Sequence, residues 1–405
     1  MNFALQSKFH SPSFCLNHQN FDSSSKHQLK QHFPIKFPSK FSLKSANLAV
    51  LDMVKKKKQI EGASEELNSI ASQNLDHAES RRRVRSAFIE AHNQLDHPLF
   101  KWAPAGIITE EWYERNSKGL EIFMKSWMPP VGVEIKGAVF FCHGYGDTCT
   151  FFFEGIARHI AASGYVVFAL DHPGFGLSQG LHGYIPSFDE LVDNVIEQYT
   201  KIKGRAQLKG LPCFILGQSM GGAVTLKVHL KEPQAWDGMV LVAPMCRIAE
   251  DVKPAPAVEK ILTLLARVMP KAKLVPQKDL SELFIRDLKT RKLADYNVIG
   301  YSDPVRLKTA VELLKATEEI EAQLEKVSSP LLIIHGAEDK VTDPLVSRFL
   351  YEKASSKDKT LKLYEGGYHC ILEGEPGDRI FTIFSDMISW LDSRCSVKSC
   401  AQLTT

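Results

Sequence analysis

The stretch ILGQSMGGAV, residues 215–224, places a serine between two glycines, behind an apolar run and ahead of residues able to form a helix. In a Gly-x-Ser-x-Gly turn between a strand and a helix, the serine hydroxyl is exposed at a sharp, strained bend. The glycines let the strand and the helix approach without a clash of side chains. Gly217, Ser219 and Gly221 fit this pattern, so Ser219 is a candidate nucleophile.

A serine hydroxyl is a poor nucleophile at neutral pH and needs a histidine base that is oriented by an acid. On a fold with this turn, the expected chain order is serine, then aspartate or glutamate, then histidine. His369, in YEGGYHCILEGEP, is the preferred base, and Asp339, in IIHGAEDKVTDP, is the preferred acid. Glu338 and Asp343 are the rival acids. Asp343 stands just before a proline and is expected to cap the following helix instead.

Other histidines and one further aspartate fit the catalytic order less well. His335, His172 and His143 lie upstream of the acid or in other loops. Asp171, in DHPGFGLS, ends an apolar run before a Gly-rich turn. We expect a structural role for Asp171.

The reaction also needs N–H donors for the oxyanion, and the fold supplies them from the residue after the serine and from a loop after an earlier strand. Met220 provides the first donor. The segment HGYGD, residues 143–147, offers Tyr145 as the second. Its Gly-x-Gly is too short for a dinucleotide fingerprint. Neither a metal nor an organic cofactor is required, and the eight cysteines contain no CxxC pair of the zinc-binding kind.

Short apolar runs separated by helix-length stretches surround these residues, as buried parallel strands require. A hairpin is expected first, over residues 109–130, where two β-prone runs flank Asn-Ser-Lys-Gly. The sequence therefore predicts an α/β protein with a doubly wound, mostly parallel sheet, whose ligands bind at the carboxyl ends of the strands. Its core is expected over residues 101–246 and 327–395. The runs begin at Gly137, Tyr165, Cys213, Gly238, Pro330 and Leu361.

Residues 247–326 contain no convincing strand and are expected to form an inserted helical cap. One face of the predicted helix APAVEKILTLLARVM is apolar, either because it packs against the sheet domain or because it also lines an acyl pocket. That face consists of Val258, Ile261, Leu262, Leu265 and Met269.

The amino end differs from the rest of the chain. Residues 1–50 hold nine serines and six lysines against a single acid, Asp22, and show no apolar periodicity. Such a Ser-rich, acid-poor leader resembles a transit peptide of the plastid kind. We expect residues 1–58 to be a disordered leader that directs the protein to the chloroplast, with a cytoplasmic tail as the alternative. Residues 59–100 are expected to form a helical extension, with one helix over 61–95.

With 405 residues, of which 44% are hydrophobic and 24% charged, the chain has the composition of a globular protein. No stretch approaches the roughly 20 apolar residues of a spanning helix, so contact with lipid is expected to be peripheral, through the cap. The run KKKK at 55–58 lacks interleaved aromatic residues, which argues against a nucleic-acid partner.

The motifs HGYGD, DHPGFGLSQG, GQSMGGAV, HGAEDKVTDP and GGYHCILEGEP, in that order, resemble the monoacylglycerol lipase group of α/β-hydrolases. They are most similar to its plant branch, which includes lysophospholipases and caffeoylshikimate esterase. The resemblance covers residues 100–392 and implies an α/β-hydrolase fold. It also implies a triad of Ser219, Asp339 and His369 with an oxyanion hole at Tyr145 and Met220.

The expected function is hydrolysis of a carboxylic ester through an acyl-enzyme on Ser219, with monoacylglycerols as the first substrate class. Caffeoylshikimate or another hydroxycinnamate ester, and lysophospholipids, are the alternatives. An aspartate nucleophile would indicate a dehalogenase or epoxide hydrolase, but position 219 is serine. A more remote alternative is a receptor on the same fold that binds a ligand without catalysis.

Overall fold

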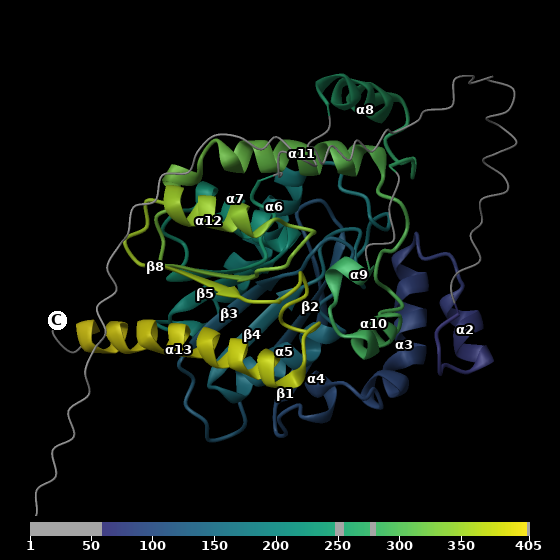
Figure 1. Cartoon of the computed structure of the whole chain (residues 1–405). Coiled ribbons are helices and arrows are strands. Elements are labelled where there is room, and N and C mark those ends of the chain that lie inside the picture. Colours follow the sequence, from purple (N-terminus) through teal and green to yellow (C-terminus); the bar gives the residue numbers. More distant parts are fainter. Residues whose placement is uncertain (1–58, 248–254, 276–280, 403–405) are drawn as a thin grey trace, which may run out of the picture. The chain divides into compact units, whose positions relative to one another are not determined.

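The computed structural model describes residues 59–247, 255–275 and 281–402. The predicted leader at 1–58 lies outside these residues. The described chain is built on one sheet of eight strands, with helices on both faces (Figure 1). The strands are β1 (Ile108–Arg115), β2 (Glu121–Met128), β3 (Gly137–Cys142), β4 (Tyr165–Leu170), β5 (Cys213–Gln218), β6 (Gly238–Val242), β7 (Leu331–Gly336) and β8 (Lys359–Tyr364).

The strand order in the sheet is β1-β2-β4-β3-β5-β6-β7-β8. The predicted hairpin forms the β1 edge, where β1 pairs antiparallel with β2, and β2 pairs antiparallel with β4. All remaining pairs are parallel. The doubly wound, mostly parallel sheet predicted from the apolar runs is therefore confirmed, as is the α/β-hydrolase fold class.

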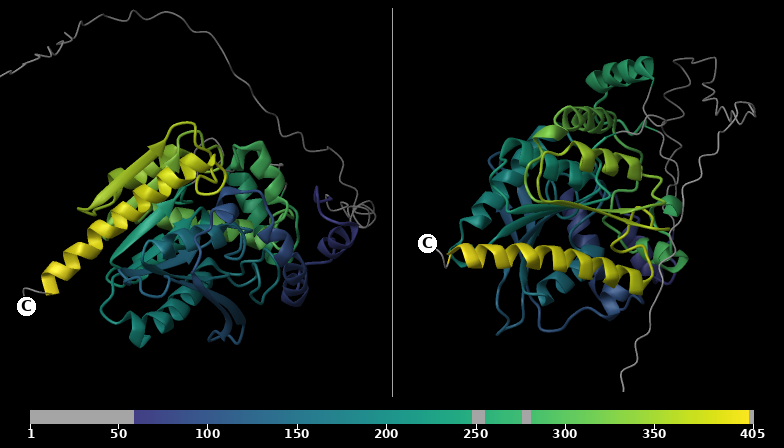
Figure 2. Two further views of the ribbon diagram at one scale, coloured as in Figure 1. Left: turned by 90° about the horizontal axis from the view of Figure 1, so that it is seen from below. Right: turned by 60° about the vertical axis from the view of Figure 1, so that its left-hand side comes forward.

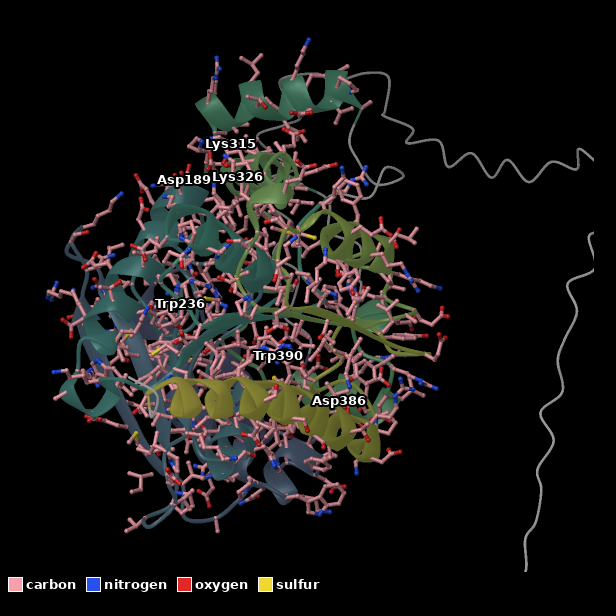
Figure 3. The ribbon with its side chains drawn as sticks, turned by 90° about the vertical axis from the view of Figure 1, so that its left-hand side faces the viewer. Asp189, Trp236, Lys315, Lys326, Asp386 and Trp390 are labelled. Atoms are coloured by element: carbon pink, nitrogen blue, oxygen red, sulfur yellow. The ribbon has the colours of Figure 1, made fainter. Side chains whose placement is uncertain are left out.

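Side chains of the strands alternate between two hydrophobic cores, because successive residues of a strand point to opposite faces. In β3, Val139 and Phe141 join one core, and Phe140 joins the other. Figure 3 labels one large aromatic residue from each core: Trp390, which belongs to α13, and Trp236, on the other side of the sheet. Both faces are thus covered, which explains why the strands are apolar throughout.

The helices divide between the two faces, and Figure 2 shows the two layers from other directions. The first core is covered by α3 (Ala78–Asn93), α4 (Pro98–Lys101), α5 (Phe152–Ala162) and α13 (Gly377–Gln402). The second core is covered by α6 (Phe188–Lys203), α7 (Met220–Lys231), α11 (Leu307–Glu321) and α12 (Pro344–Lys353). Single 3-10 turns lie at Ala206–Leu208 and Leu324–Lys326.

The amino-terminal extension contains two helices before residue 95, where the sequence predicts one over 61–95. They are α2 (Glu65–Ala71) and α3. Polar side chains between them bond to the local backbone: the Ser72 hydroxyl donates to the Ser69 carbonyl at 2.7 Å, and the Asp76 N–H donates to Asn74 Oδ1 at 2.9 Å. Such bonds compete with a continuous helix and end α2.

The extension is tied to the sheet domain by a buried arginine. Arg81 of α3 is fully buried and donates to the backbone carbonyls of Gly176 at 2.5 Å, Ser178 at 2.6 Å and Leu75 at 2.8 Å. Burial lowers the pKa of Arg81 to about 10. The loop after β4 thus obtains hydrogen-bond donors from a helix almost a hundred residues earlier in the chain.

The segment between β6 and β7 contains α8 (Pro256–Val268), α9 (Ser281–Phe284) and α10 (Leu288–Ala294), followed by α11. The predicted apolar face of α8 does not close onto the sheet domain: Ile261 is 58% exposed and Met269 is 44% exposed. Instead α8 lies outside α11 (Figure 1). The only buried residue of α8 is Ala266. Val258 and Leu262 are half-buried, which fits a narrow contact along one side of the helix.

Within the described ranges, no helix combines the length and the apolar composition that crossing a bilayer requires.

Candidate active site

Ser219 stands at the bend between β5 and α7. Its backbone adopts a φ of 54°, a left-handed conformation that is rare for a residue with a side chain and costs energy. The two flanking glycines make the bend possible. A side-chain carbon at Gly217 would collide with the Gly221 carbonyl, and one at Gly221 would collide with the carbonyl of Cys142 in β3. The turn therefore has the strained geometry that exposes a nucleophilic serine.

The structure brings the three residues of the predicted triad together from three separate loops. The Ser219 hydroxyl lies 3.0 Å from His369 Nε2, and His369 Nδ1 lies 2.7 Å from Asp339 Oδ2. His369 is 2% exposed and Asp339 is 4% exposed, whereas Ser219 is half-buried. This arrangement can pass the serine proton to an imidazole whose orientation is fixed by a carboxylate.

Asp339 is held as a carboxylate by the donors around it. Burial alone would raise its pKa, but hydrogen bonds from His335 and His369 outweigh burial and hold the pKa of Asp339 well below its usual range. The backbone N–H groups of Val341 and Thr342 donate to Oδ1 at 2.7 and 3.1 Å. Asp339 is therefore ionised in the pH range where esterases work, as an acid that orients a histidine must be.

The rival acids lie elsewhere. Glu338 is exposed, and Asp343 caps α12 by accepting from the Leu345 N–H at 2.8 Å. Asp171, for which the sequence predicts a structural role, is fully buried and accepts from the backbone N–H groups of Cys149 and Leu177. It ties the loop after β3 to the loop after β4.

The two predicted oxyanion donors border the nucleophile. Met220 is the first residue of α7, so its N–H has no partner within the helix. Gly144 lies directly against the serine, because a side-chain carbon at this position would be 3.4 Å from Ser219 Cβ. Across the described parts of the chain, neither the Tyr145 N–H nor the Met220 N–H donates to a backbone carbonyl. Both donors are free to bind an oxyanion.

The Tyr145 side chain fixes the loop that carries this N–H. Its hydroxyl donates to the Gly183 carbonyl at 3.2 Å, and its ring packs edge-on against Phe175 and Tyr301. His143, two residues earlier, accepts from the His172 N–H at 2.9 Å through Nε2. These contacts position the loop without using the N–H that would face the substrate.

A segment that sequence reasoning did not single out completes the site on the histidine side. We call residues 284–306 the inner arm of the insert. The Phe284 ring stands perpendicular to the His369 imidazole with the centroids 5.1 Å apart, and the Phe284 carbonyl accepts from the Cys370 N–H at 2.9 Å. Arg286 donates to the Gly366 carbonyl at 3.1 Å. The histidine loop is thus held at both ends.

The inner arm also holds the oxyanion loop. The Tyr301 N–H donates to the Gly146 carbonyl at 2.7 Å, and the Asn297 amide donates to Asp147 Oδ1 at 3.0 Å. Gly146 and Asp147 directly follow Tyr145, so both bonds act on the loop that carries the second donor. Nothing in the local sequence pattern of the arm signals these contacts, because they join residues about 150 positions apart.

A second buried carboxylate lies beside the triad. Glu373 Oε1 accepts from the amide of Gln218, the residue before Ser219, at 2.8 Å. Burial, followed by repulsion from Asp147, raises the pKa of Glu373 to about 7. In the part of the chain that the structure describes, no group of three or more histidines, cysteines or acids could hold a metal ion. The site as described supports acyl transfer carried by side chains and backbone N–H groups.

Comparison with protein families gives an independent result. Residues 133–377 match the family described as serine aminopeptidase, S33. The match begins just before β3 and ends at the start of α13, so it includes Ser219, Asp339 and His369.

Individual relatives agree with this family. The chain is 36% identical to the caffeoylshikimate esterase of Arabidopsis thaliana, over 70% of this chain and 89% of that protein. It is 31% identical to the human monoglyceride lipase, over 71% of this chain and 91% of that protein. A soluble variant of the Saccharomyces cerevisiae monoglyceride lipase, solved with a substrate analog, superposes with a TM-score of 0.59 at 25% identity. That superposition covers 71% of this chain and 96% of the yeast chain.

The site and the family match point to the same conclusion. The strained serine lies at the end of β5, the aspartate and the histidine follow it in the expected order, and the family match covers more than half of the chain. The chain belongs to the S33 serine hydrolase family of the α/β-hydrolase superfamily.

Proposed function

We propose that the protein hydrolyses carboxylic esters through an acyl-enzyme on Ser219. The observation that carries this proposal is the continuous chain of hydrogen bonds from Ser219 through His369 to Asp339 at a serine with positive φ. Such a chain activates a hydroxyl that would otherwise be inert at neutral pH.

The proposed mechanism has two steps. His369 Nε2 takes the Ser219 proton as the oxygen attacks the ester carbonyl, and the N–H groups of Tyr145 and Met220 hold the oxyanion. The imidazolium then gives its proton to the leaving alcohol, and the acyl group remains on Ser219. Water, deprotonated by the same imidazole, attacks the acyl-enzyme; the imidazolium then returns the proton to the Ser219 oxygen as the acid leaves.

Monoacylglycerols are the proposed substrate class. Relatives named monoglyceride lipase support it. Each methylene of an acyl chain that becomes buried contributes about 0.8 kcal/mol, so kcat/KM should rise with chain length and then level off once the acyl site is filled.

A second candidate is caffeoylshikimate, since a relative at 36% identity is named caffeoylshikimate esterase. That ester carries a carboxylate, which an apolar site would accept only if a cation faced it. Lysophospholipids are the third class. A comparison of kcat/KM for monoacylglycerols of increasing chain length, caffeoylshikimate and lysophosphatidylcholine separates the three. A flat chain-length profile with a strong preference for caffeoylshikimate would contradict the lipase proposal and leave the triad intact.

A fluorophosphonate probe separates an esterase from a receptor on this fold, because the probe labels only an activated serine. We expect the wild-type protein to be labelled and Ser219→Ala to remain unlabelled, with turnover reduced at least about 10⁴-fold. Near wild-type turnover in Ser219→Ala would overturn the assignment of the nucleophile. A wild-type protein without labelling would favour the receptor.

We also propose that α8 makes peripheral contact with a lipid surface. Large apolar side chains stand exposed along the helix, with Glu259, Lys260 and Arg267 on its polar side. An amphipathic helix of this kind inserts its apolar side at the boundary of headgroups and acyl chains. The exposed apolar residues are Ile261, Leu264, Leu265, Val268 and Met269. Co-sedimentation with phosphatidylcholine vesicles measures this contact.

We propose that residues 1–58 direct import of the protein into plastids. The support is compositional: ten lysines and two acids, many serines and no arginine. A fluorescent reporter fused to residues 1–58 should accumulate in plastids, and diffuse cytosolic fluorescence would refute the proposal. Deletion of residues 1–58 should leave esterase activity unchanged, because these residues lack the apolar pattern of a core.

A further inference from the structure

The triad aspartate is shared by two histidines. His335, at the end of β7, is fully buried, and its Nε2 lies 3.0 Å from Asp339 Oδ2, the same oxygen that faces His369 Nδ1 at 2.7 Å. The other ring nitrogen, His335 Nδ1, lies 2.7 Å from the hydroxyl of Ser347, which is also fully buried in α12. The bonds therefore run in one chain from serine to histidine, aspartate, histidine and serine.

The partners of His335 show that its Nε2 carries a proton. Nε2 faces the ionised carboxylate of Asp339 and, at 2.9 Å, the carbonyl of Thr342. Both groups only accept hydrogen bonds, so Nε2 donates. Nδ1 faces the Ser347 hydroxyl, which is able both to donate and to accept. Both ring nitrogens of His335 therefore have hydrogen-bond partners inside the protein.

Asp339 Oδ2 is consequently a crowded acceptor. It receives His369 Nδ1, His335 Nε2 and the Thr342 hydroxyl, the last at 2.9 Å. When one carboxylate oxygen accepts several hydrogen bonds, each of these bonds is weaker than a single bond to that oxygen would be. The attraction between Asp339 and a protonated His369 is therefore weaker than it would be if His369 were the only imidazole on that oxygen.

We propose that His335 is a positioning residue of the catalytic machinery, which fixes the Asp339 carboxylate and limits how strongly that carboxylate stabilises protonated His369. The inference rests on the proposed esterase function. Its consequence is that the acidic limb of the pH–rate profile lies at lower pH than it would without His335. The anchor of this device is Ser347 in α12, outside the loops that carry the triad.

Other ionisable groups also face the His369 loop and must stay constant in a test. Glu373 and Cys370 follow His369 in the same loop, and Asp147 faces them from the oxyanion loop. None of these side chains hydrogen-bonds to His335 or Ser347. A change at His335 therefore alters one partner of Asp339 and leaves these acids in place.

The test compares two substitutions in the full chain. His335→Leu keeps most of the volume and removes the donor, whereas His335→Gln retains an amide N–H that can reach Asp339. The measurement is the pH dependence of kcat and kcat/KM on a soluble short-chain ester. Rates are normalised to the fraction of enzyme that a fluorophosphonate labels, so that misfolded protein does not count.

For His335→Leu we expect the acidic limb of the kcat/KM profile to move to higher pH by about 0.5–1 unit. We also expect kcat at the optimum to fall roughly tenfold with KM nearly unchanged, because Asp339 is less firmly held. His335→Gln should restore both toward wild type. An unmoved acidic limb in His335→Leu, or an equal shift in both variants, would overturn the proposal.

If His335→Leu does not fold, Ser347→Ala serves as the second variant. It leaves the imidazole in place and removes the hydroxyl that anchors Nδ1, so a smaller shift in the same direction is expected. No shift in Ser347→Ala would then contradict the proposal. Activity that survives Ser219→Ala would instead contradict the esterase assignment itself, so the two failures are distinguishable.

Discussion

The inner arm and α8 belong to the same insert between β6 and β7, yet they relate to the rest of the molecule in opposite ways. The arm buries Ile285, Ile299 and Tyr301 and bonds to both catalytic loops. Helix α8 buries one alanine and exposes Val268 at 76%. Predicted from sequence as one helical cap, the insert contains a part that supports catalysis and a part that faces outward.

The difference teaches that a helical insert need not act as a unit. Bonds from the arm reach the residues directly after Tyr145 and directly after His369, so a displacement of the arm would disturb two parts of the chemistry at once. Helix α8 touches the layer below it through α11. We therefore expect substitutions in the arm to change turnover and substitutions in α8 to change only the encounter with lipid.

The largest effect should come from the acid that both histidines share. Asp339→Asn should reduce kcat about 10⁴-fold, because an amide at this position favours the wrong tautomer of His369. The matched variant Asp343→Asn should stay within about twofold of wild type, because asparagine also caps a helix. Steady-state kinetics on a soluble ester measure both. Loss of activity in Asp343→Asn alone would mean that the acid has been misassigned.

Within the insert, the sharpest contrast is between Phe284 and Leu264. Phe284→Ala removes the ring that stands over His369, and we expect kcat/KM on a soluble ester to fall roughly tenfold, because the imidazole loses a packing partner and gains water. Leu264→Ala, in α8, removes a side chain that is 63% exposed and should change kcat/KM by less than about twofold. Equal losses of kcat/KM in the two variants would contradict the proposed difference between the inner arm and α8.

The outward role of α8 can be measured directly. Replacing Leu264 and Val268 together by serine should weaken co-sedimentation with phosphatidylcholine vesicles about fivefold or more, since burial of each apolar side chain contributes to binding. Hydrolysis of a soluble ester should not change. Undiminished vesicle binding by the double variant would argue that α8 does not contact the lipid.

A smaller effect concerns Glu373, whose loop the arm holds through a bond from the Asp287 N–H to the Gly374 carbonyl at 3.2 Å. The pKa of Glu373 is about 7 in the folded protein against 4.5 for an ordinary glutamate. The folded protein therefore favours the protonated form of Glu373. The contribution of this group to the free energy of unfolding is fully present below about pH 4.5 and is lost as the pH rises through 7.

Glu373→Gln cannot ionise, so the Tm of this variant relative to wild type should rise by roughly 5 °C between pH 5 and pH 8. Thermal unfolding at the two pH values is the measurement. Glu338→Gln, at an exposed glutamate, is the matched control and should show no such trend. A difference in Tm that does not depend on pH would contradict the raised pKa.

Much of the fold could be predicted because its signals are local. Apolar runs such as those beginning at Tyr165 and Cys213 mark strands that are buried on both faces, and the turn residues at Ser219 mark the nucleophile. Contacts between the site and residues from distant parts of the chain could not be predicted from the sequence. From the sequence His335 is only a rival base, because nothing in the chain order shows that it shares Asp339 with His369. Phe284 and Asn297 carry no motif.

The exposure of α8 could not be predicted for a different reason. A periodic apolar face shows that a helix has one side to cover, but it does not say whether protein or lipid covers it. The apolar pattern does not reveal the break between α2 and α3, because the apolar spacing on either side, around Ile70 and Val84, is nearly in phase with one helix. The polar residues between them decide against it.

The buried guanidinium of Arg81 has a consequence for how much of the amino end can be dispensed with. Three carbonyls, those of Leu75, Gly176 and Ser178, receive their hydrogen bonds from this one side chain. Any proteolytic maturation or shortened expression boundary beyond α3 would leave the loop after β4 with unsatisfied carbonyls in an apolar surrounding. The smallest autonomous enzyme therefore begins well before the first strand, and recombinant boundaries should be placed ahead of Leu75.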